Sequence, residues 1–257
     1  MMAFLPTLLA LLAFGFVVAG LIHISGVGAG VLLVPSLMVI FKLSPTAAVA
    51  TASLFSVLFR VGSIASIRRS GHVQWPAFKR FVMFALPVAA VCAALAGFVP
   101  KVMPQWRSAI DGTVRGLVLV ACLIALVSLY SERIKAGLRK LGMAGMASVS
   151  GFFIGASGVG GGALVVPALL SLGTLSATEA IATSSVISIV LMASSSLLYA
   201  ISGAVQWLYL LCMLVGGYAS LPLAIRVQKR LSQKTLVDIV AALIVVSLNG
   251  MAIQWFV

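Results

Sequence analysis

The chain has 257 residues, 62% of them hydrophobic and only 8% charged, whereas a soluble globular domain carries about 25% charged residues. Its 17 Lys and Arg against 4 Asp and Glu give a formal net charge of +13, but these basic residues lie between long apolar runs. The composition therefore excludes an ordinary soluble domain. The placement of the basic residues between apolar runs indicates a membrane-topology signal and not a nucleic-acid partner.

Hydropathy predicts an all-α integral membrane protein with five helical segments in each half of the chain. The segments lie near residues 4–24, 27–41, 46–67, 78–99 and 113–130, and then near 142–157, 159–173, 178–201, 205–225 and 235–256. Those at 27–41 and 159–173 are only about 22 Å long at 1.5 Å per residue. They either cross as short helices or dip in and return as re-entrant hairpins, so each half has five or three crossings.

An internal repeat relates the two halves with an offset of 132 residues (157 − 25). The segment Ser25-Gly-Val-Gly-Ala-Gly-Val-Leu-Leu-Val-Pro35 reappears as Ser157-Gly-Val-Gly-Gly-Gly-Ala-Leu-Val-Val-Pro167, and the alignment runs without a gap to Trp75 and Trp207. Of these 51 aligned positions 23 are identical, glycines and polar residues included, which shared hydrophobicity alone would not produce. The predicted domains are a first transmembrane repeat (1–131), a basic cytoplasmic linker (132–141) and a second transmembrane repeat (142–257).

The basic residues predict that the two repeats have inverted topology. The loop after the third segment carries Arg68, Arg69, Lys79 and Arg80 in the first half, while its equivalent, residues 202–206, carries no charge. Because Lys and Arg are enriched in cytoplasmic loops, the two equivalent loops lie on opposite sides of the membrane. Each half then crosses an odd number of times, as in transporters built from inverted repeats.

Two glycine-rich turns are the candidate anion-binding elements. The free N–H groups and the positive dipole end at the start of a helix can hold an anion, and glycine lets a ligand approach the backbone. The alternative is that these glycines only allow membrane helices to pack closely. The predicted substrate-binding residues are Ser25, Gly26, Gly28 and Gly30 in the first turn and Ser157, Gly158, Gly160, Gly161 and Gly162 in the second.

Hydroxyl groups on the third segment of each half are further candidates. Thr51 and Ser53, with their equivalents Thr183 and Ser185, could complete an anion cage. The alternative is that each hydroxyl bonds to the carbonyl four residues earlier in its own helix.

Three ionisable residues also stand in or beside apolar segments. Arg60 either attracts the substrate or extends toward the basic cytoplasmic end of its helix. His23 and Glu179 are candidates for proton coupling. Glu179 also fits a helix-capping box, Ser176-x-x-Glu179.

Motifs that would indicate an enzyme are missing from the sequence. It has no H-E-x-x-H, no Walker A loop, no intramembrane carboxylate pair and only two histidines. We therefore expect no catalytic residue, no metal site and no cofactor.

The duplicated Gly-x-Gly-x-Gly, followed by an apolar stretch, Val-Pro and then Ala-Thr-x-Ser about sixteen residues later, resembles the TauE/SafE family of sulfite and organosulfonate exporters. The likeness covers nearly the whole chain. It implies a secondary transporter that moves a small anion, such as sulfite, sulfoacetate or a related organic acid, across the bacterial inner membrane. It also implies that Pro35 and Pro167 belong to the binding elements, while Ala29 departs from the family's fuller glycine run.

The sequence thus predicts alternating access between two glycine turns that meet near the midplane, with export as the expected direction and proton coupling left open. A passive anion channel that uses the same helix ends is the alternative function. The expected partners are a small anionic substrate and the lipid bilayer, and a homodimer stays open.

Overall fold

The structure is a computed structural model that describes residues 4–25, 29–62, 73–130, 142–159, 165–171 and 175–228, with six further positions between 238 and 250. Every regular element in these ranges is helical, as hydropathy predicts. The helices are α1 (Phe4–Ser25), α2 (Ala29–Val39), α3 (Pro45–Gly62), α5 (Trp75–Val102), the 3₁₀ turn η1 (Pro104–Trp106), α6 (Arg107–Tyr130), α8 (Gly142–Ser157), α9 (Val165–Ser171), α10 (Ala177–Ile201) and α11 (Trp207–Gln228).

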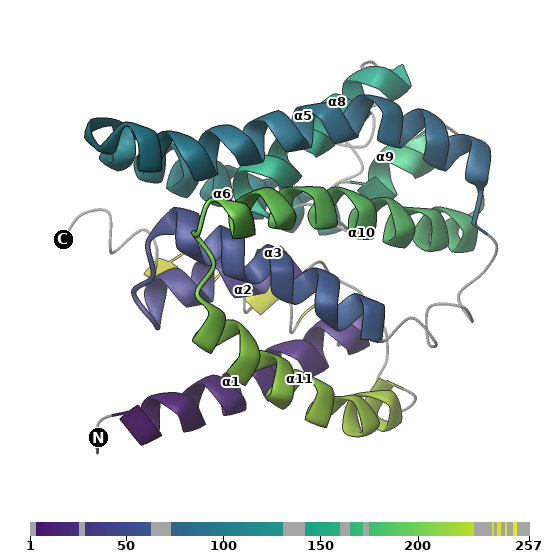
Figure 1. Ribbon diagram of the computed structural model, residues 1–257. Helices are drawn as coiled ribbons and strands as arrows, with labels where there is room; N and C mark the ends of the chain where they lie inside the picture. Colours follow the sequence, from purple (N-terminus) through teal and green to yellow (C-terminus); the bar gives the residue numbers. More distant parts are fainter. Residues whose placement is uncertain are drawn as a thin grey trace.

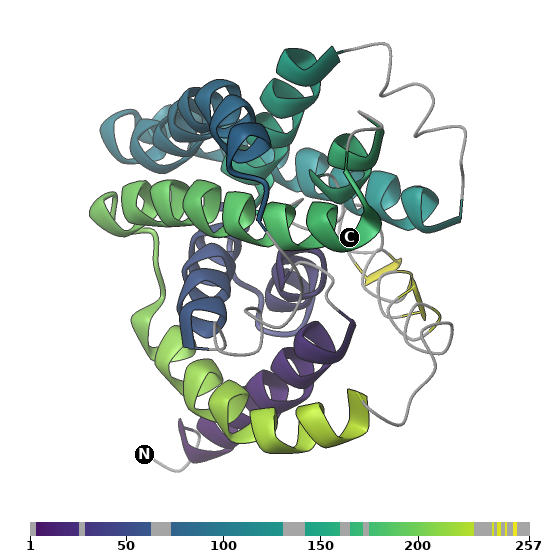
Figure 2. The ribbon, with the colours of Figure 1, turned by 90° about the vertical axis from the view of Figure 1, so that its right-hand side faces the viewer.

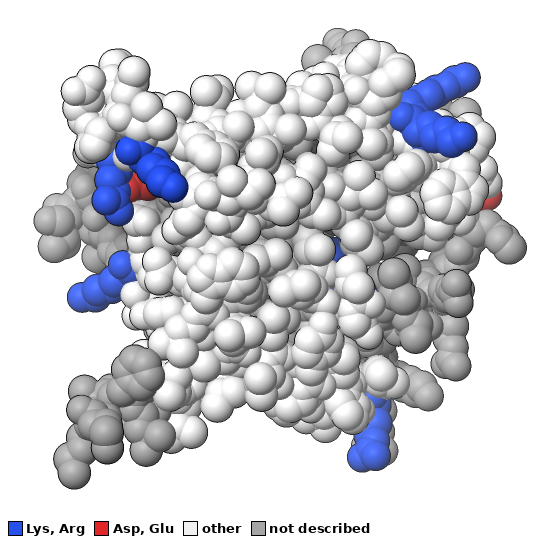
Figure 3. Space-filling view, in the orientation of Figure 1, with Lys and Arg blue, Asp and Glu red and all other residues white. Residues whose placement is uncertain are grey.

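Five of the described helices are long and apolar enough to cross a membrane. These spans are Pro6–His23, Pro45–Gly62, Trp75–Val102, Ala182–Ile201 and Trp207–Val227. On the face shown in Figure 3, charged side chains gather at two opposite ends of the molecule, and the described surface between the ends is almost without charge. Large apolar side chains such as Met83 of α5 and Val215 of α11 are more than half exposed. An apolar belt between two charged ends is the surface that a bilayer requires.

The two halves of the chain interlock through their first and fourth helices. The helix α1 packs along α11, and α5 packs along α8, in the two most extensive helix contacts among the described residues. These pairs lie at opposite edges of the molecule, with α3 and α10 between them (Figure 1), and a view turned by 90° shows the same order (Figure 2). Each pair therefore joins a helix of one half to a helix of the other.

Small residues let both pairs approach closely and in an equivalent way. A Cβ on Gly151 of α8 would collide with the backbone of Ala85 in α5. In the other pair, a Cβ on Gly217 of α11 would lie 3.0 Å from the Cβ of Ala19 in α1. With the 132-residue offset, Ala19 corresponds to Gly151 and Gly217 corresponds to Ala85. Each pair therefore keeps a close Ala–Gly contact, but the glycine lies on the first helix of the half in one pair and on the fourth helix in the other.

The buried side chains form two clusters that follow this exchange of helices. The residues of one cluster come from α5, α8, α9 and α10, and those of the larger cluster come mostly from α1, α2, α3, α6 and α11. We call α1, α2, α3 and α11 body 1, and α5, α8, α9 and α10 body 2. Each body combines the first three helices of one half with the fourth helix of the other, and α3 contacts α10 between the bodies.

Several helix ends differ from the sequence-based expectation. The first short helix ends at Val39, before the predicted 41, and Val159, where the second was predicted to begin, is not helical; the described part of the second is Val165–Ser171. Gly158, with a φ of +64°, ends α8 and does not open the helix that follows, because glycine adopts this left-handed conformation easily at a helix C-terminus. The predicted linker 132–141 and most of the final segment, 235–256, lie outside the described residues.

Candidate functional site

The two glycine-rich turns touch each other where the halves of the chain cross. A Cβ on Gly30, in the first turn of α2, would collide with the backbone of Gly158 and lie 3.0 Å from the Cα of Val159. The N–H of Gly158 donates to the carbonyl of Ile154 at 3.0 Å, which closes the last turn of α8. Backbone approaches this closely only where no side chain intervenes. The contact therefore brings one glycine of each predicted turn into one place.

The hydroxyl of Ser53 lies against the same contact. The position that a Cβ of residue 158 would occupy is 2.8 Å from Ser53 Oγ and 3.3 Å from Cγ1 of Val49, both on α3. Ser53 is only 1% exposed, and its Oγ has no hydrogen-bond partner among the described residues. Leaving a buried hydroxyl unsatisfied costs about 1–3 kcal/mol, so its presence calls for an explanation such as a ligand.

Other buried serines nearby satisfy their hydroxyl groups within their own helices. Ser56 Oγ donates to the carbonyl of Ala52 at 2.6 Å, and its repeat equivalent Ser188 donates to Ser184 at 2.6 Å. Ser157 Oγ likewise donates to the carbonyl of Phe153 at 2.6 Å. These serines have the bonds to the helix backbone that the alternative interpretation expected, and Ser53 does not.

Thr51 and Thr183 receive equivalent hydrogen bonds across the two halves. The backbone N–H of Gln206 donates to Thr51 Oγ1 at 3.1 Å, and the N–H of Gln74 donates to Thr183 Oγ1 at 3.0 Å. Both threonines are fully buried, and all four positions are related by the 132-residue offset. Because each threonine oxygen accepts here, its own proton remains available to another acceptor.

Glu179 occupies a structural position at the start of α10. The predicted capping box is confirmed, with the N–H of Ser176 donating to Glu179 Oε2 at 2.9 Å and the N–H of Glu179 donating to Ser176 Oγ at 3.4 Å. In addition, Nε2 of Gln74 donates to Glu179 Oε1 at 2.5 Å. Glu179 and Thr183, one turn apart, therefore both hold Gln74 in front of α5.

The structure does not bring all the predicted residues to this contact. Arg60 lies in the last turn of α3, seven residues and about 10 Å along the helix from Ser53. His23 lies in the last turn of α1, and Ser185 is partly buried in α10. Gly26, Gly28, Gly160, Gly161 and Gly162 lie outside the described residues, and Ser25 is the last residue of α1.

One polar contact was not expected from the sequence. Oδ1 of Asp111 in α6 accepts hydrogen bonds from the N–H of Thr46 at 3.3 Å and from Thr46 Oγ1 at 2.7 Å, which caps the start of α3. The two residues are 65 positions apart in the sequence, so no local motif predicts this hydrogen bond. Within the described ranges, no group of three or more His, Cys, Asp and Glu side chains could hold a metal ion.

Comparison with known proteins identifies the family. The family described as "Sulfite exporter TauE/SafE" matches residues 11–251. "Probable membrane transporter protein YjnA" of Bacillus subtilis (strain 168) is 22% identical over 251 residues, which cover 93% of this chain and 97% of that protein. "Probable membrane transporter protein YunE" of the same organism is 34% identical over 100 residues, 39% of this chain and 37% of that protein.

No solved structure matches the chain. The family match nonetheless covers nearly the whole sequence, and the described helices include several that can span a membrane. This chain is therefore a multi-pass membrane transporter and belongs to the sulfite exporter TauE/SafE family.

Proposed function

We propose that this transporter exports a small sulfur oxyanion, sulfite or an organosulfonate, across the cytoplasmic membrane by alternating access. The observation that carries the proposal is the buried, unpartnered hydroxyl of Ser53 beside the contact between Gly30 and Gly158. The description of the family as a sulfite exporter supports the substrate class.

The chemistry of the contact suits an anion. Sulfite and sulfonate groups each present three oxygens that accept hydrogen bonds, and a serine hydroxyl can donate to one of them. The start of α2, where Gly30 lies, adds the positive end of the helix dipole, about half an elementary charge. A site of this kind stabilises negative charge without burying a cation, whose desolvation would cost several kcal/mol.

The reciprocal threonine contacts support an inverted repeat. In a twofold arrangement residue i contacts residue j, and the equivalent of j contacts the equivalent of i; Thr51 with Gln206 and Thr183 with Gln74 follow this rule. Gln74 directly precedes α5, whereas Gln206 lines a cavity with Lys101 at the other end of α5. The two contacts therefore lie at opposite ends of a helix about 42 Å long, which supports a twofold axis across this helix, in the membrane plane.

The division into two bodies suggests how access alternates. Ser53 lies on α3 of body 1 and Gly158 directly follows α8 of body 2, so the proposed site lies where the two bodies meet. Tilting one body against the other about the crossing of α3 and α10 would separate these residues on one side of the membrane at a time.

The orientation follows from the basic residues. If the start of α5 and the end of α11 face the cytoplasm, the sequence segments expected on that side carry twelve of the 17 Lys and Arg residues, apart from Arg60 within α3, as the positive-inside rule requires. The opposite, extracytoplasmic end then carries Lys42, Lys101, Arg107 and Arg115. This excess of basic residues favours a location in the inner membrane, with the start of α5 in the cytoplasm and its end on the opposite side.

Replacing Ser53 with Ala tests the proposed site. We expect efflux of labelled sulfite from proteoliposomes to fall about 10- to 100-fold, because a hydrogen bond to a charged ligand contributes about 1.5–3 kcal/mol. The thermal unfolding temperature should stay unchanged or rise, since the variant removes an unsatisfied buried hydroxyl. Ser56→Ala is the matched control, because Ser56 is equally buried and bonds to its own helix. Efflux by Ser53→Ala at the wild-type rate would exclude this site.

Counterflow of labelled sulfite distinguishes a carrier from a passive channel. A carrier loaded with unlabelled sulfite should accumulate external label transiently, because its site faces only one side at a time. Currents that grow with voltage, without counterflow, would instead identify a channel and contradict alternating access.

A further inference from the structure

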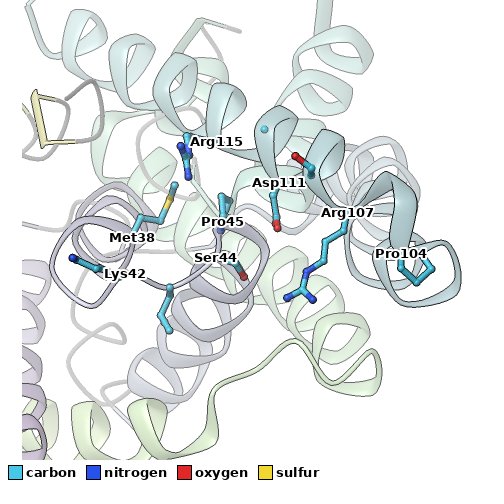
Figure 4. Close-up of a pocket in the computed structure, with 11 residues that line it drawn as sticks. Met38, Lys42, Ser44, Pro45, Pro104, Arg107, Asp111 and Arg115 are labelled. Carbon is cyan, nitrogen blue, oxygen red and sulfur yellow. The ribbon is translucent and has the colours of Figure 1, made fainter. Parts of the chain in front are cut away.

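A basic cavity lies at the end of the molecule where α2 is joined to α3. It has a volume of about 1020 Å³ and is lined by the loop after α2 and by the first turns of α6 (Figure 4). Three lining side chains are cationic, Lys42, Arg107 and Arg115, and Asp111 is the one anionic side chain among the lining residues. The lining therefore has a net formal charge of +2.

The two arginines are not neutralised by the aspartate between them. Arg107, Asp111 and Arg115 are spaced four residues apart on α6, which places them on one face of the helix and normally favours ion pairs. Asp111 points instead toward Ser44 and Pro45 (Figure 4), and its Oδ1 accepts both hydrogen bonds from Thr46. Nε of Arg115 is buried and has no hydrogen-bond partner among the described residues. The positive charge thus remains available to a ligand.

A smaller cavity adjoins the basic cavity at the start of α3. It has a volume of about 400 Å³, shares Arg107 and Asp111 with the basic cavity, and is also lined by Lys101 and Gln206. The N–H of Gln206 donates to Thr51, which lies on α3 two residues before Ser53. The cationic side chains therefore line two adjoining cavities, and these reach the start of α3, the helix that carries the unpartnered serine.

We propose that the basic cavity is a second, outer anion-binding site that receives the exported oxyanion after it leaves the central site. Its place on the export route rests on the function proposed above, whereas its chemistry rests on the arginines. A guanidinium group holds two oxygens of a sulfur oxyanion through two parallel N–H donors. Because the cavity is open, its arginines stay partly hydrated, so binding is weak and sensitive to salt, as release to the outside requires.

Equilibrium binding of labelled sulfite to the full chain in lipid nanodiscs tests this site. The measurement is made at ionic strengths of about 0.01 M and about 1 M, where the Debye length is about 30 Å and about 3 Å. We expect two sites per chain at low salt and only the buried one at high salt. Arg107→Gln and Arg115→Gln should each weaken the salt-sensitive site about tenfold, the loss expected for one charged hydrogen bond.

Three controls make the result decisive. Arg226→Gln removes an exposed charge in the last turn of α11, outside both cavities, and should leave both sites intact. Arg115→Lys keeps the charge without the planar fork and should bind between wild type and Arg115→Gln. Ser53→Ala should remove only the salt-insensitive site; if it removes neither site, the central site is wrong while the outer one stands. Wild-type binding at low salt by both glutamine variants, with unchanged thermal unfolding, would overturn the outer site.

Discussion

Glycine at position 158 is required for two separate reasons. Its φ of +64° lies in the left-handed region, where a side chain clashes with the backbone. A Cβ there would also come 2.8 Å from Ser53 Oγ. Gly203, with a φ of +75°, shares the first requirement but has no atom within 4 Å of the same position. Comparing substitutions at the two glycines therefore distinguishes the effect of backbone strain from the effect of crowding at the proposed site.

Alanine at these two positions should have different effects. We expect Gly203→Ala to lower the free energy of unfolding by about 1–2 kcal/mol, the cost of the left-handed conformation for a residue with a side chain. Gly158→Ala should cost more and should also reduce sulfite efflux, because the added carbon displaces the Ser53 hydroxyl. Thermal unfolding in detergent and efflux from proteoliposomes measure the two effects. Equal losses of stability with full efflux in both variants would contradict the role given to Gly158.

At the level of helices, each fourth helix is held at its start by the other half of the chain. The N–H groups at a helix start have no partner within the helix. Here the N–H of Gln74, in front of α5, donates to Thr183 Oγ1, and the N–H of Gln206, in front of α11, donates to Thr51 Oγ1. These bonds pin α5 to body 2 and α11 to body 1.

Valine at either threonine should destabilise the fold. Thr51→Val and Thr183→Val keep the side-chain shape but remove the acceptor of a partly buried backbone N–H, which costs about 0.5–1.5 kcal/mol, the net contribution of a typical hydrogen bond. Because the two contacts are equivalent, we expect similar losses. Thr113→Val is the control, since its exposed hydroxyl bonds only to the carbonyl of Ala109, and it should change stability by less than about 0.5 kcal/mol. Unchanged unfolding of both buried variants would contradict the pinning role.

At the scale of the whole molecule, the exchange of fourth helices makes the two halves inseparable. Neither half has a complete core by itself, because α11 completes the packing of α1 and α3, and α5 completes that of α8 and α10. The proposed inversion places equivalent loops on opposite sides of the membrane. The charged ends seen in Figure 3 are then the two membrane surfaces.

Cysteine labelling tests this orientation. In a chain whose Cys92, Cys122 and Cys212 are replaced by alanine, we expect Lys42→Cys to react with a membrane-impermeant maleimide in intact bacterial cells. Arg226→Cys should react only after the membrane is made permeable, because the proposed orientation puts the end of α11 on the cytoplasmic side. Sulfite efflux by each variant shows that the chain is folded. Labelling of both positions from the same side would contradict the proposed topology.

Local patterns were enough to predict the helical membrane class, the repeat and the capping box at Ser176 and Glu179. Hydropathy, residue spacing and the contact between positions i and i+3 are properties of neighbouring residues, so they can be read along the chain. The prediction that Thr51 and Thr183 have related roles also followed from the repeat. Their partners could not be predicted, because nothing local joins them to Gln206 and Gln74.

The sequence by itself therefore determined that the chain is a helical membrane protein and which residues are equivalent between the halves. Only the tertiary structure decided that the fourth helices are exchanged, and that Asp111 caps α3 and so leaves Arg107 and Arg115 to form a basic cavity. Only the tertiary structure, too, decided that the Ser53 hydroxyl has no hydrogen-bond partner among the described residues, whereas the Ser56 hydroxyl bonds to its own helix. The physical reason is that these features depend on how helix surfaces far apart in the chain fit together, and that fit is set by side-chain volume and close backbone approach.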